Sequence, residues 1–289
     1  MQYTFKATDT VHTTIQLAMG EVTVTADDVD EVTVDVTPTQ PGRPADVRAA
    51  ENTAVDFSDN RLGIMQKRET IVRTWITRSW SVDVLVRVPR GSRLNVASSY
   101  GNIRIHGGIG PSSLTTSYGD ISVGETTDLN ARTTYGEISV ERISGTASLT
   151  GSSLLLGEVH GTAVAKSSHG NLSADLVLGT LNAASGTGNI EIRTLVGELE
   201  ARAGYGRIRI ADAVSGTAHL AATHADVEVG IRPGTLAWLD LDTRNGTVRN
   251  ELDTAVPAPG NDGDGTADRL KVTARSTHGS IRAFRAAVR

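Results

Sequence analysis

The sequence predicts an all-β protein, a β-solenoid (β-helix) of about ten short coils with an N-terminal β-rich cap. The first observation is a repeated motif of tyrosine, glycine and two alternating aliphatic residues, as in "ASSYGNIRI" from Ala97 and "TTSYGDISV" from Thr115. The second observation is the regular spacing of this motif. The third is a composition with 30 glycines and only 4% aromatic residues, which favours many turns and thin apolar layers.

The first 90 residues lack the clear repeat, but residues 21–38 and 79–89 alternate in polarity as β-strands do. An open solenoid end exposes unpaired backbone and core, so terminal units of such folds are atypical. The sequence therefore predicts that residues 1–90 form an N-terminal β cap or divergent first coils.

Within this region, "GEVTV" from Gly20 resembles "GEISV" from Gly136, which indicates that a divergent coil starts there. A break is marked by three prolines, Pro38, Pro41 and Pro44. We expect Trp75 and Trp80 to pack inside the region as core anchors rather than to form a ligand platform.

Residues 91–289 are predicted to form the solenoid proper, with the motif glycine as the anchor of each coil. The anchors are Gly101, Gly119, Gly136, Gly170, Gly188, Gly206, Gly246 and Gly279. Two periods lack a glycine, and we expect Ser153 and Ala225 to fill them. Gly101 and Gly246 are then 145 residues and eight steps apart, about 18 residues a step.

Each period is expected to hold two short strands and two glycine-marked corners. Aliphatic residues two and four positions after the anchor alternate with polar ones, which is typical of a strand with one buried face. A second alternating pair precedes the anchor by seven and five positions, as in Leu199 and Ala201. A repeat this short must bury its apolar face against copies of itself. A β-propeller or a sandwich is the alternative, but those folds need longer or less regular periods.

The step between the last two anchors is too long by one period, and residues 253–268 account for the excess. Their proline, glycine and aspartate content predicts a loop inserted between the last two coils. Asp262, Asp264 and Asp268 suggest a calcium loop, but the full EF-hand pattern is not met, so an acidic loop without metal is the favoured interpretation.

The net charge of −5 and the pI near 5.8 do not favour a nucleic-acid partner. The chain has no cysteine, which excludes disulfides and thiolate chemistry. The polar N-terminal residues show no secretory signal, and no apolar stretch is long enough to span a membrane, so the expected location is cytoplasmic.

The run "VRVPRGSRLNVASSYGNIRI", residues 86–105, leads into the repeats. It resembles the DUF4097 family, bacterial proteins labelled putative adhesins, in which "V-x-V-P-x-G-x-x-L-x-V" precedes "S-x-G-x-I-x-V" repeats. The resemblance covers about residues 10–285. It implies a β-helical fold and no established activity, and its adhesin label rests on analogy of fold.

The position before each anchor is the main candidate site, because it gathers four of the five tyrosines and three of the seven histidines. Its candidate binding residues are Tyr100, Tyr118, Tyr135, His169, Tyr205, His224 and His278. Coil stacking predicts that they form a ladder along one edge. Such a ladder shapes the corner, and if exposed it binds a glycan or an extended partner.

The position after the anchor carries Asp120 and Glu137 in neighbouring coils. A carboxylate pair can serve acid–base chemistry, but Asn and Asp there also suit a turn, which is the favoured interpretation. No nucleophile, phosphate-loop or metal-ligand motif stands in a suitable context.

We therefore expect no enzyme, cofactor or metal, and a non-catalytic scaffold or protein-interaction module of a bacterial cell. Its partner would be an unknown protein or a second copy of the chain, with a glycan also possible. The alternatives are an adhesin-like surface or carbohydrate-binding protein and, less favoured, a polysaccharide-cleaving β-helix enzyme.

Overall fold

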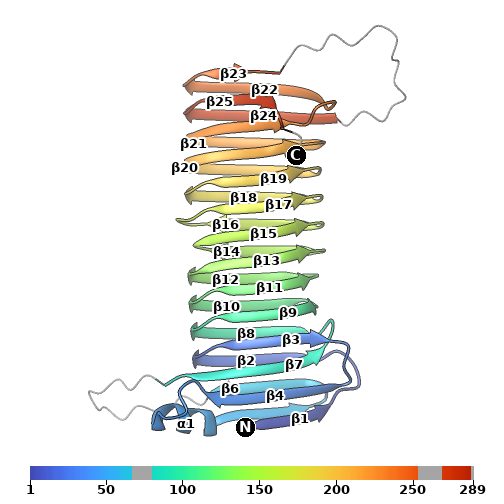
Figure 1. Ribbon diagram of the computed structural model, residues 1–289, viewed down its shortest axis with the longest axis vertical. Coiled ribbons are helices and arrows are strands. Elements are labelled where there is room, and N and C mark those ends of the chain that lie inside the picture. Colours follow the sequence, from blue (N-terminus) through green and yellow to red (C-terminus); the bar gives the residue numbers. More distant parts are fainter. Residues whose placement is uncertain (67–79, 253–268, 288–289) are drawn as a thin grey trace, which may run out of the picture. The chain divides into compact units, whose positions relative to one another are not determined.

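The computed structural model describes residues 1–66, 80–252 and 269–287, in which one short helix accompanies β-strands (Figure 1). The chain divides into two compact units, unit 1 (Met1–Gly151) and unit 2 (Ser152–Arg289). The all-β fold and the solenoid class are confirmed. Trp75 and the loop predicted at 253–268, with its three aspartates, lie outside the described residues.

Unit 1 contains one helix and the first strands of the chain. They are β1 (Gln2–Lys6), β2 (His12–Met19), β3 (Val22–Asp27), β4 (Glu31–Pro38), α1 (Pro44–Glu51), β5 (Thr53–Ser58), β6 (Arg61–Gln66), β7 (Val82–Pro89), β8 (Arg93–Tyr100), β9 (Ile103–Ile109), β10 (Ser112–Tyr118), β11 (Ile121–Thr126), β12 (Leu129–Tyr135), β13 (Glu137–Ile143) and β14 (Thr146–Gly151).

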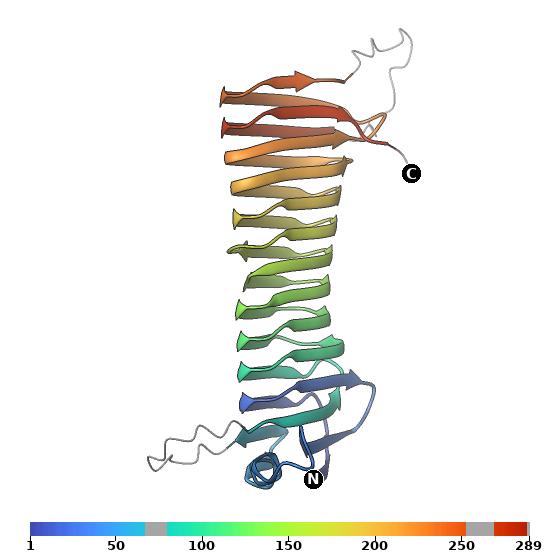
Figure 2. The same cartoon turned by 60° about the vertical axis from the view of Figure 1, so that its left-hand side comes forward.

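Consecutive strands of unit 1 form coils of two strands each, and successive coils stack in parallel register (Figure 2). The strand before each anchor pairs with its equivalent, as β10 does with β8 and β12. The strand after the anchor does the same, as β11 does with β9 and β13. Ile103, Ile121 and Ile138 therefore lie in line inside the coils, and all three are fully buried.

The anchor glycine makes the corner between the two strands. Gly119 has φ = +154°, and a Cβ atom placed on it would lie 2.2 Å from the Gly101 carbonyl oxygen of the preceding coil. A side chain at this corner would overlap the backbone, so the position of Gly119 requires glycine. The Oγ1 hydroxyls of Thr116 and Thr133 donate to the carbonyls of Gly101 and Gly119, which fixes each corner to the one before it.

The first coils of unit 1 do not stack in the order of the sequence. The coil β2–β3 lies between the coil β6–β7 and the coil β8–β9, because β2 pairs with both β6 and β8 and β3 pairs with both β7 and β9. The amide of Gly20 donates to the carbonyl of Tyr100, so a coil corner stands at Gly20, in the place of an anchor.

The coil β6–β7 is covered on its outer side. There β5 pairs antiparallel with β6, and β4 pairs antiparallel with both β7 and β1. The rings of Phe5 and Phe57 stack at 4.9 Å, and Ala49 and Ala50 of α1 are buried. Trp80, expected in the core of this region, is half-buried.

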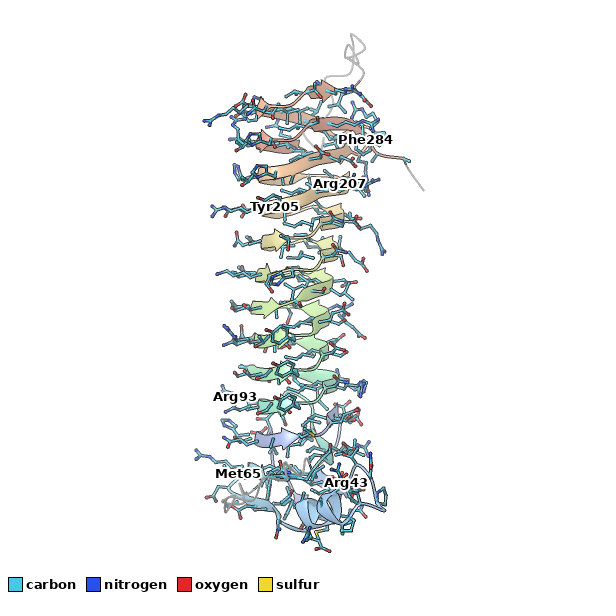
Figure 3. All side chains as sticks on the ribbon, turned by 90° about the vertical axis from the view of Figure 1, so that its left-hand side faces the viewer. Arg43, Met65, Arg93, Tyr205, Arg207 and Phe284 are labelled. Atoms are coloured by element: carbon cyan, nitrogen blue, oxygen red, sulfur yellow. The ribbon has the colours of Figure 1, made fainter. Side chains whose placement is uncertain are left out.

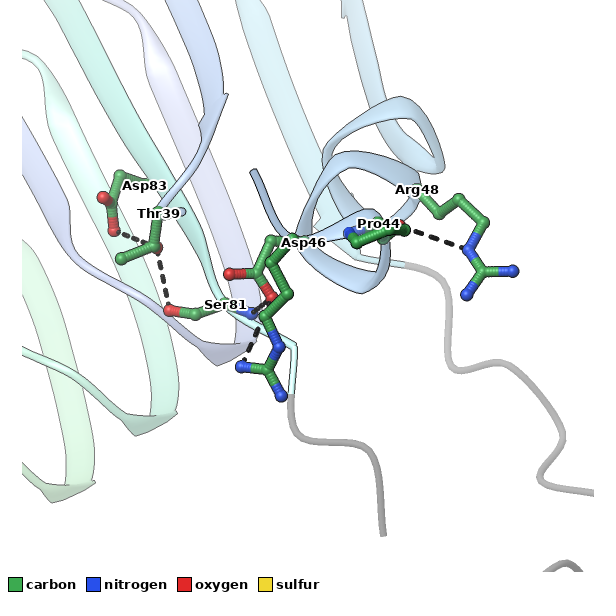
Figure 4. A network of polar contacts seen from close by, with 7 residues as sticks. Thr39, Pro44, Asp46, Arg48, Ser81 and Asp83 are labelled. Atoms are coloured by element: carbon green, nitrogen blue, oxygen red, sulfur yellow. Dashed lines mark hydrogen bonds and ion pairs between the residues drawn. The ribbon is translucent and has the colours of Figure 1, made fainter. Parts of the chain in front are cut away.

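Polar contacts attach α1 to the start of β7 (Figure 4). The buried Asp46 carboxylate accepts the Ser81 amide at 3.2 Å and lies 3.8 Å from Arg43. The Thr39 hydroxyl contacts the Ser81 hydroxyl and the Asp83 carboxylate, at 2.9 and 2.8 Å. Pro44 starts the helix at a position where a missing amide costs nothing. Of the three prolines that mark the break, Pro38 ends β4 and Pro44 begins α1, a helix that strand periodicity did not predict.

Unit 2 continues the two-strand coil pattern. Its strands are β15 (Ser153–Val159), β16 (Thr162–Ser167), β17 (Leu172–Val177), β18 (Thr180–Thr187), β19 (Ile190–Leu195), β20 (Glu198–Ala213), β21 (Gly216–Ile231), β22 (Leu236–Asn245), β23 (Val248–Asn250), β24 (Arg269–His278) and β25 (Ile281–Arg285). The long strands β20 and β21 each run through an anchor corner and supply both strands of a coil.

The anchor of the coil β14–β15 was predicted at Ser153, but it lies one residue earlier, at Ser152. Leu154 pairs with Leu172 and is fully buried, whereas Leu155, expected in the core, is exposed. The hydroxyl of Ser167 donates to the Ser152 carbonyl, as Thr116 does to Gly101 in unit 1, so Ser152 holds the anchor position. The preceding period is two residues shorter than the mean, and sequence spacing alone placed the missing anchor too far along.

The order of the last two coils also differs from the sequence. The coil β24–β25 pairs with β21 on one side and with β22 and β23 on the other. The coil β22–β23, although earlier in the chain, is therefore the terminal one. Val248 was expected in the core but is 44% exposed, and Leu239 and Leu241 are half-buried. No further described coil covers them.

Candidate functional site

The tyrosines of unit 1 form a stacked ladder at the anchor corner. Tyr118 is in parallel register with Tyr100 and Tyr135. Its ring centroid lies 4.9 Å from that of Tyr100 and 5.0 Å from that of Tyr135, with interplanar angles of 3° and 13°. These distances match the spacing of hydrogen-bonded strands, so the backbone register itself produces the stack. All three side chains are about half exposed.

A second ladder, in unit 2, consists of Tyr205, His224 and His278. Tyr205 stacks on His224 at 4.9 Å, and His224 stacks on His278 at 4.7 Å (the corner faces the viewer in Figure 3, where Tyr205 is labelled). His278 follows His224 directly because β24 lies next to β21, and Asn245 is in register with His278 on its other side. The three side chains are exposed.

His169 lies apart from these stacks. It is exposed at the corner of its coil, and no aromatic ring of the described residues stacks on it. Thr187, in register with Tyr205, ends the aromatic run of unit 2 on that side. The structure thus groups six of the seven predicted column residues into two ladders of three and leaves His169 single.

The stacking decides which contacts a ladder offers. Each inner ring uses both faces on its neighbours, so the ring edges, with phenol hydroxyls and imidazole nitrogens, point outward. A sugar that stacks on an aromatic face would find only the faces at the ends of a ladder. The ladders therefore present rows of hydrogen-bonding groups at strand spacing rather than broad aromatic platforms.

The position after the anchor has a structural role. The Asp120 amide donates to the Asn102 side-chain oxygen, and the Asp120 carboxylate accepts the Glu137 amide, each at 2.9 Å. The same bond links the Asn189 amide to Asn171 in unit 2. These side chains join successive corners, which is the turn interpretation of the Asp120 and Glu137 pair.

The described residues contain no group of three or more His, Asp or Glu side chains placed to hold a metal ion. Two exposed ion pairs, Arg275–Asp240 and Arg282–Glu251, join the coil β24–β25 to the terminal coil of unit 2. A hydrogen bond from Arg275 holds the pKa of Asp240 below its usual range, and a hydrogen bond from Arg282 does the same for the pKa of Glu251.

A row of cations along the column of unit 2 was not predicted from the sequence. Lys166, Arg202 and Arg275 each stand three residues before a column residue, namely His169, Tyr205 and His278. A scan of that position along the repeat would have found them. No described helix has the length and apolar character that crossing a membrane requires.

Comparison with protein-family models matches residues 12–283 to one family, described as Toastrack DUF4097. The chain belongs to the DUF4097 family. The resemblance identified from residues 86–105 is thus confirmed, and the match covers the solenoid coils of both units of this DUF4097 chain.

Solved structures similar to this DUF4097 protein share little sequence with it. A "putative adhesin" from Bacteroides fragilis has 13% identity and a TM-score of 0.38, covering 98% of this chain and 96% of that one. A "putative adhesin" from Parabacteroides merdae has 10% identity and a TM-score of 0.38, covering 98% and 95%. A "putative lipid binding protein" from Parabacteroides distasonis has 15% identity and a TM-score of 0.35, covering 98% and 96%. Comparison with curated proteins found no match.

Proposed function

We propose that this DUF4097 protein is a non-catalytic interaction module that holds an extended protein partner along its ladder-bearing corners. The observation that carries the proposal is the pair of exposed ladders. A buried stack would be explained by packing alone, but here the polar edges of Tyr118 and His224 face solvent. Exposed tyrosines are enriched in protein interfaces because one ring offers both apolar area and a hydrogen bond.

The test is affinity capture from a lysate of the source cell with the wild-type chain and ladder variants. Tyr118→Ser and His224→Ser remove one rung of each ladder. Their controls are Leu85→Ser and His160→Ser, which change exposed side chains outside the ladders. Each lost stacking contact is worth about 0.5–1.5 kcal/mol, so thermal unfolding must first show that the variants are folded.

We expect the ladder variants to lose a partner that the wild type and both controls retain. A partner retained by all five proteins, or none above background with the wild type, contradicts the proposal. We propose in addition that the protein is cytoplasmic, as the sequence predicts. Fractionation that finds it at the cell surface would contradict this location.

Two other functions are distinguished by separate measurements. If the chain is an adhesin-like carbohydrate-binding protein, it should bind immobilised glycans through the ladder edges and fractionate with the cell surface. Self-association would proceed through the terminal coil β22–β23, whose described strands pair on one side only. Light scattering over a range of protein concentrations distinguishes it from binding to a different protein.

A further inference from the structure

A groove lined by cations and small side chains runs beside the Tyr205–His224–His278 ladder on the outer face of unit 2. It has a volume of about 670 Å³ and crosses β16, β18, β20, β21 and β24. Three cations line it, Lys166, Arg202 and Arg275, and no carboxylate does. Gly204 and Thr277 of the lining directly precede Tyr205 and His278 in the chain, so the ladder follows the groove along one side.

The cations of the groove alternate with alanines in successive coils. Lys166 is in register with Ala184, Ala184 with Arg202, Arg202 with Ala221, and Ala221 with Arg275. Hydrogen-bonded strands lie about 4.8 Å apart, so the cations recur at roughly 9.6 Å, every second coil. The third cation depends on the reordered coils, because β22 next to β21 would place Asp242 where Arg275 stands.

The arginines have donors to spare for a ligand. Arg202 pairs with Glu200 and Arg275 with Asp240, and both carboxylates lie outside the groove lining. Nη1 of Arg275 also donates to the main-chain oxygens of Asp240 and Ala274, which leaves its Nε and one Nη2 hydrogen for a ligand. Exposed ion pairs of this kind contribute little energy, and a guanidinium carries five donors in a planar fork. An incoming carboxylate can therefore bind each arginine without first losing a strong contact.

The groove is shallow, and small residues line it where the main chain of a peptide ligand would lie. A Cβ atom on Gly186 or Gly204 would lie 2.7 or 2.5 Å from a carbonyl oxygen of the preceding coil, so neither position accepts a side chain without a backbone shift. Thr223 and Thr277 add hydroxyls to the lining. These groups suit a ligand with a polar, hydrogen-bonding backbone and no large apolar anchor.

The cation spacing selects the conformation of a peptide ligand. Acidic side chains on one face of a β-strand recur at about 6.6 Å, which does not match the cations. A polyproline-II helix has three residues per turn and rises about 3.1 Å per residue, so every third side chain recurs at about 9.3 Å on one face. Its backbone groups have no internal partners and can bond to the hydroxyls and imidazoles beside them.

We propose that this groove binds a polyproline-II segment of a partner protein that carries Asp or Glu at every third residue. The inference rests on the proposed function and names the chemistry of the partner at unit 2. The carboxylates contact Lys166, Arg202 and Arg275, and the peptide backbone lies between these cations and the ladder.

The test uses two fluorescent twelve-residue peptides with four glutamates and eight prolines each. One has glutamate at every third position, and the other has glutamates at alternate positions followed by a proline run. Anisotropy titrations with the full chain should show at least about tenfold tighter binding of the first peptide, since only that peptide can bring three charge-assisted contacts into register. Binding should weaken steeply as salt rises.

Three variants locate the site. Arg202→Gln should weaken binding of the period-three peptide about fivefold or more, whereas Arg193→Gln, an exposed arginine on another strand of unit 2, should leave it unchanged. Ala221→Glu places a carboxylate midway between Arg202 and Arg275 and should weaken binding of the period-three peptide through like-charge repulsion.

Equal affinity of the two peptides for the wild type, or an equal effect of Arg193→Gln and Arg202→Gln, overturns the proposal. An acidic polysaccharide or a single-stranded oligonucleotide that binds as tightly and loses affinity in Arg202→Gln also overturns it, because the groove is then a general polyanion site. If ladder variants lose a captured partner but the peptides are not distinguished, the proposed function stands and this inference fails.

Discussion

The terminal coil β6–β7 of unit 1 and the terminal coil β22–β23 of unit 2 differ in how their outer strand edges and core residues are covered. Leu62, Ile64 and Val84 of the first are buried, because antiparallel strands and α1 cover that coil. Leu239 and Leu241 of the second are only half-buried and Val248 is 44% exposed. Described strands pair with its β22 and β23 on one side only. In the part of the chain that the structure describes, the same repeat thus ends closed in unit 1 and open in unit 2.

In both units the coil next to the terminal one is not its neighbour in the order of the sequence. The coil β2–β3 lies inside β6–β7, and β24–β25 lies inside β22–β23. A coil held on both sides gains a full set of ladder hydrogen bonds, while a terminal coil that no other strand covers gains half. The difference between the units therefore lies in what covers the terminal coil, and it can be measured residue by residue.

The largest expected difference is in the free energy of unfolding lost when two neighbouring residues of one core column are truncated. Ile281→Ala, in the coil held on both sides, should cost about 2–5 kcal/mol, because it leaves a cavity in a closed layer. Val248→Ala, next to it in the terminal coil, should cost about 1 kcal/mol or less. Urea unfolding of both variants measures the difference, and equal costs would show that the terminal coil is covered in solution.

The second expected difference is in the stability lost when two glycines with positive φ are replaced by alanine. Gly20, at +136°, faces the Val82 carbonyl oxygen, which a Cβ atom would approach to 1.8 Å. Gly234, at +91°, precedes the open coil, and a Cβ atom added there would have nothing within 4 Å. Gly20→Ala should therefore cost about 3 kcal/mol by overpacking and strain, and Gly234→Ala about 1–2 kcal/mol by strain alone. Thermal unfolding tests the ranking, which a smaller loss for Gly20→Ala would reverse.

The third effect concerns the covering of unit 1. Asp46→Ala removes the acceptor of the Ser81 amide and should cost about 1–3 kcal/mol, since it leaves a half-buried donor unpaired. Arg48→Ala, on the exposed side of the same helix, should stay within about 0.5 kcal/mol. Amide exchange of β6 and β7 should quicken in the Asp46 variant only. Unchanged exchange in both would mean that α1 does not protect the coil.

The smallest effect is the pH response of the open coil. Hydrogen bonds from Arg275 and Arg282 lower the pKa values of Asp240 and Glu251, so the stability that these pairs add is present above the ordinary pKa values of 3.8 and 4.5. It is lost as the pH falls through the lowered values of the folded state. Below about pH 4, amide exchange in β22 and β23 should quicken before exchange in β20. Asp240→Asn with Glu251→Gln should remove this pH dependence, and its persistence would point to other groups.

Much of the fold could be predicted from the sequence because each coil repeats the same short pattern. The anchor glycines and the alternation after them placed Ile103, Ile121 and Ile138 in one buried column. The prediction failed at Ser153, where a short period hid a one-residue shift, and at α1, whose helix depends on capping and packing rather than on period.

The candidate site could be predicted in part. Repetition at the position before the anchor identified Tyr118 and His224 as members of a column, and parallel register then stacks such residues. Their exposure, the use of ring faces by neighbouring rings and the groove beside them could not be predicted, because they depend on which side of the corner each side chain takes.

The sequence by itself determined the period of the solenoid, the face of each strand that is buried and the residues of the ladder column. Only the tertiary structure decided which coil lies next to which. Every coil carries the same local pattern, so nothing local distinguishes a correct neighbour from another coil. The chain path and the long-range pairing therefore decide the order, and with it whether Arg275 or Asp242 follows Ala221 in the groove.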